Sequence, residues 1–284
     1  MAYAELHCLS NFTFLRGASH PRELVERAAQ LGYTALALTD ECSVAGVVRA
    51  HEAAKEQGLS LIVGSEIRLD DGLRLVLLAI DRLGYGNLCR LITLGRRSAS
   101  KGSYRLTRTD LEQGVPGCLA LLLPDVAPDP LQAAWVREIF PERCWLAVEL
   151  HAGSDDRHRL AALTAFAETT GIPLVATGDV HMHARARCVI QDTLTAIRLG
   201  RPVKDCGQAL FPNGERHLRT FKRLAAIYPP ALLEESVRIA ERCTFSLDSL
   251  RYEYPDELVP AGLTPARHLR ALTEAGLSRR FPAG

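Results

Sequence analysis

The amino-acid sequence predicts an α/β protein whose strands close into a barrel-like sheet, with additional helices toward the C-terminal end. Apolar runs of strand length alternate with segments of helical period from the N-terminus to about residue 180. Helical crossovers connect parallel strands, so we expect a mainly parallel sheet. This many alternating units favours closure into a barrel over an open sheet, and in such barrels the chemistry lies at the C-terminal strand ends.

The predicted elements follow one another at short intervals. A helix is expected over 21–32, which has proline at its start, apolar residues at helical spacing and a closing glycine. The turn Asp70-Asp71-Gly72 joins strands expected at 59–69 and 73–80, and the polar, basic stretch 97–110 reads as a loop. Further strands are expected at 3–8, 34–40, 118–124, 144–150 and 172–180, and further helices at 43–58, 84–97, 130–139 and 155–170.

From about residue 184 the pattern becomes helical. Helices are predicted in ARARCVIQDTLTAIRLG, FKRLAAIY and PALLEESVRIAERC, and a last amphipathic helix in TPARHLRALTEAGLSRRF. This last helix has little left to pack against, so we expect the native protein to continue beyond residue 284.

Bulk properties restrict the class of protein. The 284 residues carry a net charge of +1, which indicates no global nucleic-acid or membrane surface. No apolar run approaches the length of a membrane span, and the N-terminus lacks the features of a signal peptide. None of the eight cysteines forms a CxxC pair, and several lie in apolar runs. A cytoplasmic protein with reduced thiols and no membrane partner is therefore expected.

Acidic and histidine side chains recur at the ends of the predicted strands. On a strand, residues i and i+2 face the same way, so Asp179 and His181 are expected to project into one mouth. Imidazole nitrogen and carboxylate oxygen are ligands of the zinc and manganese sites that hydrolyse phosphoesters. A lone histidine is more often structural, but here the residue types recur from strand to strand. The strand-end residues are His7, Asp40, Glu41, Glu66, His151, Asp179 and His181.

Several segments together resemble a known family. They are ELHCLSNFTFLRGASHP, LALTDECSVAGVVRAH, GSEI, LLAIDRLGYGNLCRLIT and PLVATGDVHMH. Their order and spacing are similar to the N-terminal PHP (polymerase and histidinol phosphatase) domain of bacterial C-family DNA polymerases, and within these to the error-prone, damage-inducible, alpha-subunit type. The resemblance covers essentially the whole chain and implies a distorted (β/α)7 TIM-like barrel.

The resemblance also assigns site positions. In metal-binding members a His-x-His on the first strand begins a ligand cluster for up to three ions. His7 matches its first histidine and Leu9 replaces the second, Arg16 stands where the family has aspartate or histidine, and Glu41 stands where it has histidine. The positions Glu66, His151, Asp179 and His181 match family ligands.

These substitutions argue against a full metal cluster. Leu9 cannot coordinate, and the permanently charged guanidinium of Arg16 repels a divalent ion. We expect Arg16 to pair with Glu41 or another carboxylate of the mouth in place of the missing metal. No cofactor is firmly expected; at most one zinc or manganese ion would use His7, Glu66, Asp179 and His181.

Other polar residues have simpler interpretations. His20 is expected to support a helix start, and His183 to lie at the rim or at a helix start. The basic loop offers four candidate phosphate contacts, although a solvated loop is the more common reading. These contacts are Arg96, Arg97, Lys101 and Arg105.

Two functional readings remain. In the first, residues 1–245 form a PHP domain without its own catalysis, and 246–284 lead toward an absent polymerase body that would bind magnesium. The family resemblance then implies translesion synthesis in damage-induced mutagenesis, and as partners the rest of the polymerase, DNA, a mutasome accessory protein and the sliding clamp. In the second, the chain is a metal-dependent phosphoesterase or 3′–5′ exonuclease with a reduced metal site. Metal content and activity on a 3′-ended oligonucleotide discriminate between them.

Overall fold

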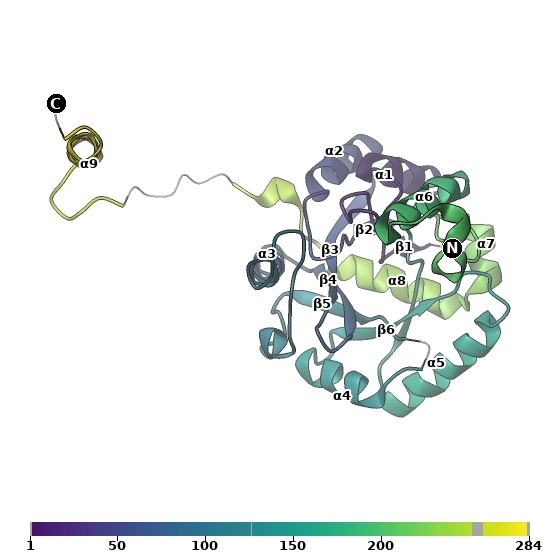
Figure 1. The fold of residues 1–284 in the computed structure, drawn as a ribbon. Helices are drawn as coiled ribbons and strands as arrows, with labels where there is room; N and C mark the ends of the chain where they lie inside the picture. Colours follow the sequence, from purple (N-terminus) through teal and green to yellow (C-terminus); the bar gives the residue numbers. More distant parts are fainter. Residues whose placement is uncertain (1, 126, 252–257, 283–284) are drawn as a thin grey trace. The chain divides into compact units, whose positions relative to one another are not determined.

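Seven strands form one barrel in the order of the sequence. The structure, a computed structural model, describes residues 2–125, 127–251 and 258–282. Strands β1, β2 and β3 run parallel, β4 is antiparallel to both neighbours, and β5, β6 and β7 are again parallel (Figure 1). The strands are β1 (Ala4–Glu5), β2 (Ala35–Leu38), β3 (Ser60–Arg68), β4 (Arg74–Ala79), β5 (Cys118–Leu122), β6 (Cys144–Glu149) and β7 (Leu174–Thr177).

The predicted barrel and its mainly parallel sheet are confirmed, and among the described strands β4 alone runs antiparallel to its neighbours. The turn at Asp70-Asp71-Gly72 is too short for a crossover, so the chain reverses and β4 pairs antiparallel with β3. The antiparallel pairing of β4 with β5 follows in turn, with α3 (Arg82–Arg97) in the connection.

The segment after β1 closes the barrel against the segment after β7. Cys8 and Val180 form a parallel bridge, in which Leu9 N donates to Val180 O at 2.8 Å and Val180 N donates to His7 O at 2.9 Å. The strand predicted over 3–8 is shorter in the structure, because the backbone N–H of His7 bonds to the Glu5 carboxylate instead of a neighbouring strand.

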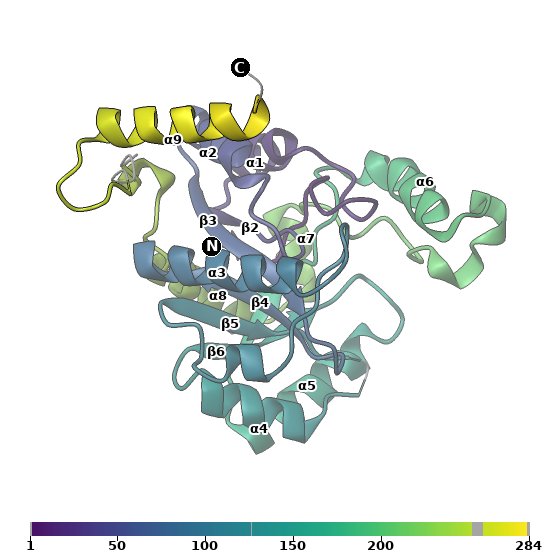
Figure 2. The ribbon, with the colours of Figure 1, turned by 60° about the vertical axis from the view of Figure 1, so that its left-hand side comes forward.

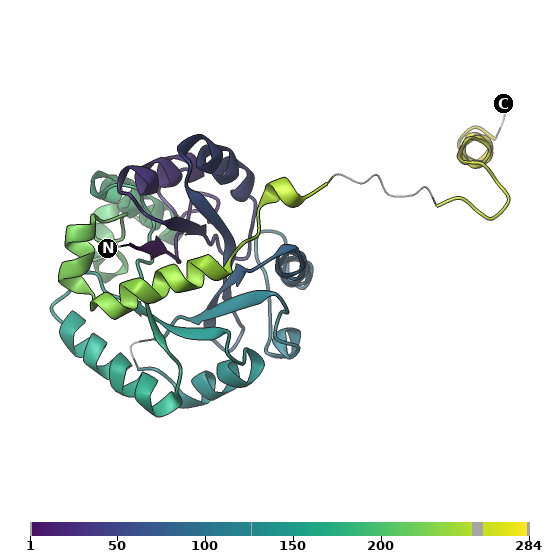
Figure 3. The same cartoon turned by 180° about the vertical axis from the view of Figure 1, so that it is seen from behind.

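Alternate strand residues fill the barrel interior, and helix α8 (Pro230–Arg242) covers one end. Ile239 and Ala240 of α8 pack with the interior residues, and Ser236 Oγ accepts a hydrogen bond from Ala4 N at 3.1 Å. Figure 3 shows α8 lying across the barrel. The site must therefore lie at the opposite end. The interior residues, on the strands or directly after them, are Ala4, Leu6, Ala35, Ala37, Ile62, Val76, Leu78, Leu119, Leu121, Leu123, Trp145, Ala147 and Val175.

Helices surround the strands close to their predicted positions. In Figure 2, α6 stands apart from the other helices of this unit. The basic stretch 97–110 is a loop with a short 3-10 turn at Thr109–Leu111. The helices are α1 (Pro21–Gln30), α2 (Val47–Gln57), α3, α4 (Pro130–Ile139), α5 (Asp156–Thr170), α6 (Cys188–Leu199), α7 (Phe221–Ile227) and α8.

A second unit begins at Leu250, a few residues after the domain boundary predicted at 245/246. It contains α9 (Pro265–Arg280), whose N-cap residue Thr264 accepts a hydrogen bond from Arg267 N. None of the residues of α9 is buried within this unit. Across the described ranges, every helix is too short or too polar to cross a membrane.

Candidate functional site at the barrel mouth

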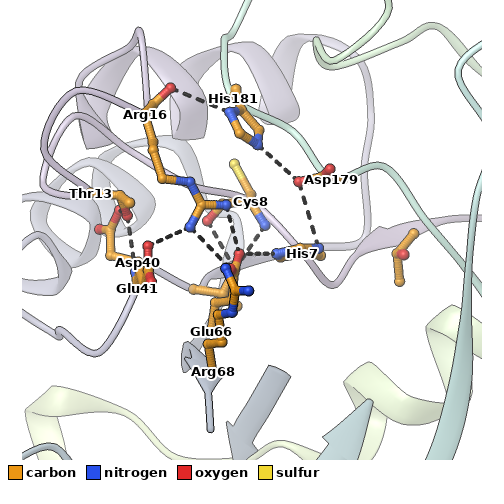
Figure 4. Close-up of polar contacts among 12 residues, drawn as sticks. His7, Cys8, Thr13, Arg16, Asp40, Glu41, Glu66, Arg68, Asp179 and His181 are labelled. Atoms are coloured by element: carbon orange, nitrogen blue, oxygen red, sulfur yellow. Dashed lines mark hydrogen bonds and ion pairs between the residues drawn. The ribbon is translucent and has the colours of Figure 1, made fainter. Parts of the chain in front are cut away.

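His7 lies just after β1 at the open end of the barrel, close to Glu66 and Asp179 (Figure 4) and to Glu149 of β6. Its Nδ1 donates to Glu149 Oε1 at 2.7 Å and its Nε2 to Glu66 Oε2 at 3.0 Å, while Asp179 Oδ1 lies 3.9 Å from Nδ1. Burial disfavours charge on the imidazole, but these two carboxylates raise the pKa of His7 to about 9. The site therefore contains an imidazolium at neutral pH, with both ring nitrogens engaged.

The strand register explains why these carboxylates meet. Glu66 follows Ile62 and Glu149 follows Ala147 on the inward-facing set of residues of their strands. Burial alone would raise the pKa of both carboxyls. Hydrogen bonding from His7 instead lowers the pKa of Glu149 to about 2 and holds that of Glu66 well below its usual range.

Arg16 bridges two acidic residues at the mouth. Its Nη1 donates to Glu41 Oε2 and, at 3.0 Å, to Glu66 Oε1, and its Nη2 donates to Glu66 Oε2 at 3.3 Å. The hydroxyl of Tyr104 also donates to Glu41, at 2.9 Å. The ion pair between Arg16 and Glu41 that the sequence predicts is thus present, and it extends to the buried Glu66.

Asp179 is held from two sides. His181 Nε2 donates to its Oδ1 at 2.9 Å, and the guanidinium of Arg216 forms an ion pair with its Oδ2. Burial lowers the pKa of His181 to about 3 and that of Arg216 to about 10, so the imidazole is neutral and the guanidinium charged at neutral pH. Arg216 also lies over the ring of Phe211, 4.2 Å from its centroid.

Backbone strain gathers around this mouth. Six non-glycine residues of the described chain have positive φ, and four of them adjoin or belong to the site. A non-glycine residue holds such a conformation only where the surrounding structure enforces it. The four are Leu15 (φ 59°), Cys42 (φ 45°), Ala152 (φ 54°) and Asp179 (φ 42°).

The loop that carries Arg16 is fixed by Asp40. This buried carboxylate accepts from Ser10 N, Ser10 Oγ and Thr13 Oγ1, each at 2.7 Å. The loop then returns so tightly that a Cβ on Gly17 would lie 1.9 Å from the Ser10 carbonyl oxygen. Asp40 therefore supports the loop and does not face His7.

The remaining predicted residues take structural positions. His151 donates from Nε2 to the Gly178 carbonyl at 3.2 Å, and burial lowers its pKa to about 3. His20 is the N-cap residue of α1, and Glu23 accepts from its backbone N–H. His183 bonds to Ser19 at the rim, and buried Leu9 offers no donor.

The candidate phosphate contacts in the basic loop are partly engaged. Arg96 donates to the carbonyls of Glu41 and Cys42, and Arg105 pairs with Asp70 at 3.2 Å. Arg97 and Lys101 are exposed. Arg96 and Arg105 thus anchor the loop, whereas for Arg97 and Lys101 both phosphate contact and a solvated loop stay predictions.

Glu149 and Arg216 belong to the site but were not predicted from the sequence. Glu149 stands two residues before His151 in CWLAVELH, so the i, i+2 rule could have placed it on the inner face. Arg216 had no such signal. It follows α6 in an irregular segment that reaches the site because His181 and Met182 donate their backbone N–H groups to its carbonyl.

Three side chains in the described residues could hold one metal ion. They are His7, Glu149 and Asp179, whose donor atoms all lie within 4.8 Å of one another. The ligand set predicted from the sequence was His7, Glu66, Asp179 and His181. In the structure the grouped residues are His7, Asp179 and Glu149, without Glu66 and His181. The set fits an ion poorly as it stands, because both nitrogens of His7 donate to carboxylates and Arg216 pairs with Asp179.

Comparison with known proteins gives the relationship of the chain. Residues 5–138 match the family model described as PHP domain. Curated error-prone DNA polymerases are 63% identical over 283 residues in Methylococcus capsulatus and 62% identical over 283 residues in Pseudomonas aeruginosa. These matches cover 99% and 100% of this chain, and the chain spans 27% of the length of each relative.

A solved structure of a putative metal-dependent phosphoesterase from Bifidobacterium adolescentis is also similar. It aligns with 80% of this chain and 95% of its own, with a TM-score of 0.49 and 17% sequence identity.

Proposed function

We propose that this chain is the non-catalytic PHP domain of an error-prone DNA polymerase, since residues 5–138 match the PHP domain model and the chain is 63% identical over 283 residues to a curated polymerase of that kind. The parent would be a DNA-directed DNA polymerase with its own magnesium site outside these residues. The domain's part is to brace the polymerase body or to bind partners.

The observation that carries this proposal is the position of Arg16. Its guanidinium bonds to both Glu41 and Glu66 and supplies positive charge where a divalent ion would otherwise neutralise these carboxylates. The imidazolium of His7 and the guanidinium of Arg216 neutralise Glu149 and Asp179 in the same way. The mouth is thus held together by protein cations.

The cellular role is proposed by analogy with the family. It comprises translesion synthesis in damage-induced mutagenesis and DNA repair, in the cytoplasm. The proposed partners are the rest of the polymerase chain, DNA bound by the full-length protein, a mutasome accessory protein and the sliding clamp.

Metal analysis and a nuclease assay test the absence of catalysis. We expect protein purified without chelator to contain far less than one equivalent of zinc or manganese, and to leave a 3′-ended single-stranded oligonucleotide intact in either metal. A His7→Ala, Asp179→Asn double variant is the control for contaminating nuclease. Cleavage by the unmodified chain that the double variant lacks would refute the proposal.

A metal-dependent phosphoesterase or 3′–5′ exonuclease with a reduced site is the alternative. The grouping of His7, Glu149 and Asp179 favours it. A zinc or manganese ion bound there would supply Lewis-acid activation of water. Near-stoichiometric metal together with oligonucleotide cleavage would favour this alternative over the non-catalytic domain.

A further inference from the structure

The mouth opens into a cleft that is richer in cations than in anions. Its volume is about 530 Å³, and five arginines and three carboxylates line it. His181, Phe14, Phe211 and Gln191 also line it. The arginines are Arg16, Arg68, Arg74, Arg198 and Arg216, and the carboxylates are Glu41, Glu66 and Asp179.

The carboxylates are already used by two of these arginines. Arg16 takes Glu41 and Glu66, and Arg216 takes Asp179. The excess positive charge therefore belongs to the other three, which we call the outer arginines: Arg68, Arg74 and Arg198.

The outer arginines lack matching carboxylates. Among the described residues, no carboxylate lies within 4.0 Å of the guanidinium of Arg68 or Arg198, and Arg74 reaches only the exposed Asp125, at 3.6 Å. Arg68 and Arg74 are also directly opposite each other in the pairing of β3 with β4. Like charges in opposed positions destabilise a sheet, so an anion between them would stabilise this pair.

A buried amide in the same cleft points to a ligand independently. Gln191 of α6 is only 2% exposed, and within the described ranges its Oε1 has no hydrogen-bond partner. A buried polar atom of this kind is costly unless something bonds to it. The amide of glutamine can present either its oxygen or its NH₂ group, so it suits a ligand that carries both acceptor oxygens and a hydroxyl.

We propose that this cleft binds a phosphate-type oxyanion without a metal ion, held by the outer arginines and by Gln191. Guanidinium groups bind phosphate oxygens in a bidentate manner, and a partly enclosed cleft strengthens such contacts. The cationic mouth attracts an anion where a metal-binding mouth would attract a cation. Binding of this kind breaks no covalent bond in the ligand.

The ligand could be free phosphate or a terminal phosphate of single-stranded nucleic acid. Titration calorimetry with inorganic phosphate, in the presence of chelator and at constant ionic strength, measures the affinity for the phosphate group that both ligands share. Binding of a labelled oligonucleotide with a 3′-phosphate, compared with the same oligonucleotide ending in a 3′-hydroxyl, identifies the source.

The variant Arg68→Gln, Arg74→Gln tests the assignment. We expect it to weaken phosphate binding about tenfold or more, since charge-assisted hydrogen bonds are lost. Arg157→Gln, at an exposed position on α5, is the matched control and should bind as the unmodified chain does. Circular dichroism and thermal unfolding of both variants exclude misfolding as the cause.

If the 3′-phosphate oligonucleotide binds more tightly than the 3′-hydroxyl oligonucleotide, the ligand is a nucleic-acid end. If the two oligonucleotides bind equally and free phosphate binds saturably, the ligand is a small anion. The proposal is overturned by absence of saturable phosphate binding, or by equal affinities in the double variant and the Arg157→Gln control. Loss of binding in chelator would also overturn it, and would point instead to the metal-dependent alternative.

Discussion

Replacing Arg16 by methionine removes the guanidinium but keeps an unbranched apolar side chain, and it is expected to destabilise the barrel. Arg16 is 23% exposed on its side chain and Glu66 only 2%, so the substitution leaves a buried carboxylate with one charged partner, His7. Removing one member of a buried ion pair costs about 3–5 kcal/mol. Because His7 remains in place, we expect a loss of about 2–3 kcal/mol in the free energy of unfolding, or about 5–10 °C in Tm for a domain of this size.

Equilibrium unfolding in guanidinium chloride, with chelator present, measures this loss. A double-mutant cycle with Glu66→Gln isolates the pair, and we expect Arg16→Met to cost much less in the Glu66→Gln background because no buried charge is left alone. Arg157→Met, at the exposed position on α5, should change the stability by less than about 0.5 kcal/mol. The reasoning fails if Arg16→Met is as mild as this control, or if its cost is unchanged beside Glu66→Gln.

Two other predictions concern residues near Arg16. Gly17→Ala should lower the free energy of unfolding by more than about 3 kcal/mol, because the added Cβ would meet the Ser10 carbonyl oxygen. Gly86→Ala, on α3 with open space around it, should raise the free energy of unfolding by about 0.5–1 kcal/mol; denaturant unfolding measures both, and equal effects would contradict the clash at Gly17. The double variant Leu9→His, Arg16→Asp should retain about one equivalent of zinc after dialysis, because it adds two ligands and removes the opposing charge. Elemental analysis checks this, and metal content unchanged from the parent would show that Arg16 does not control binding.

The fold was largely predictable because each strand and helix has a local signal. The glycine that closes α2 and the proline that begins α4 fixed those helix ends closely. Signals of this kind do not indicate the direction in which a strand runs. The antiparallel direction of β4 follows instead from the turn at 70–72, which is too short for a helical crossover. β1 could not be delimited, because its length is set by a side chain, that of Glu5, which bonds to the backbone of His7.

The site was predictable only where its residues stand at strand ends. His7, Glu66 and Asp179 meet because parallel neighbours end at one mouth. The pairing of Arg16 with a carboxylate could be predicted from its positive charge among acidic strand-end residues, without knowledge of the contacts. Arg216 arrives through tertiary pairing with the segment that follows β7, and no local pattern in its own segment predicts such a contact.

The backbone bridge between Cys8 and Val180, which closes the barrel, affects how the domain folds. It joins residues about 170 positions apart, and the site contains residues from both of the joined segments. Contacts of such sequence separation cannot form until the residues from β1 to β7 have all been synthesised. Until then His7 and Glu66 have neither Glu149 nor Asp179 near them, and the first strands present an open edge. The interval between synthesis of β1 and of β7 is therefore the period in which the nascent chain is most exposed to aggregation, and a chaperone that covers β1 would protect it.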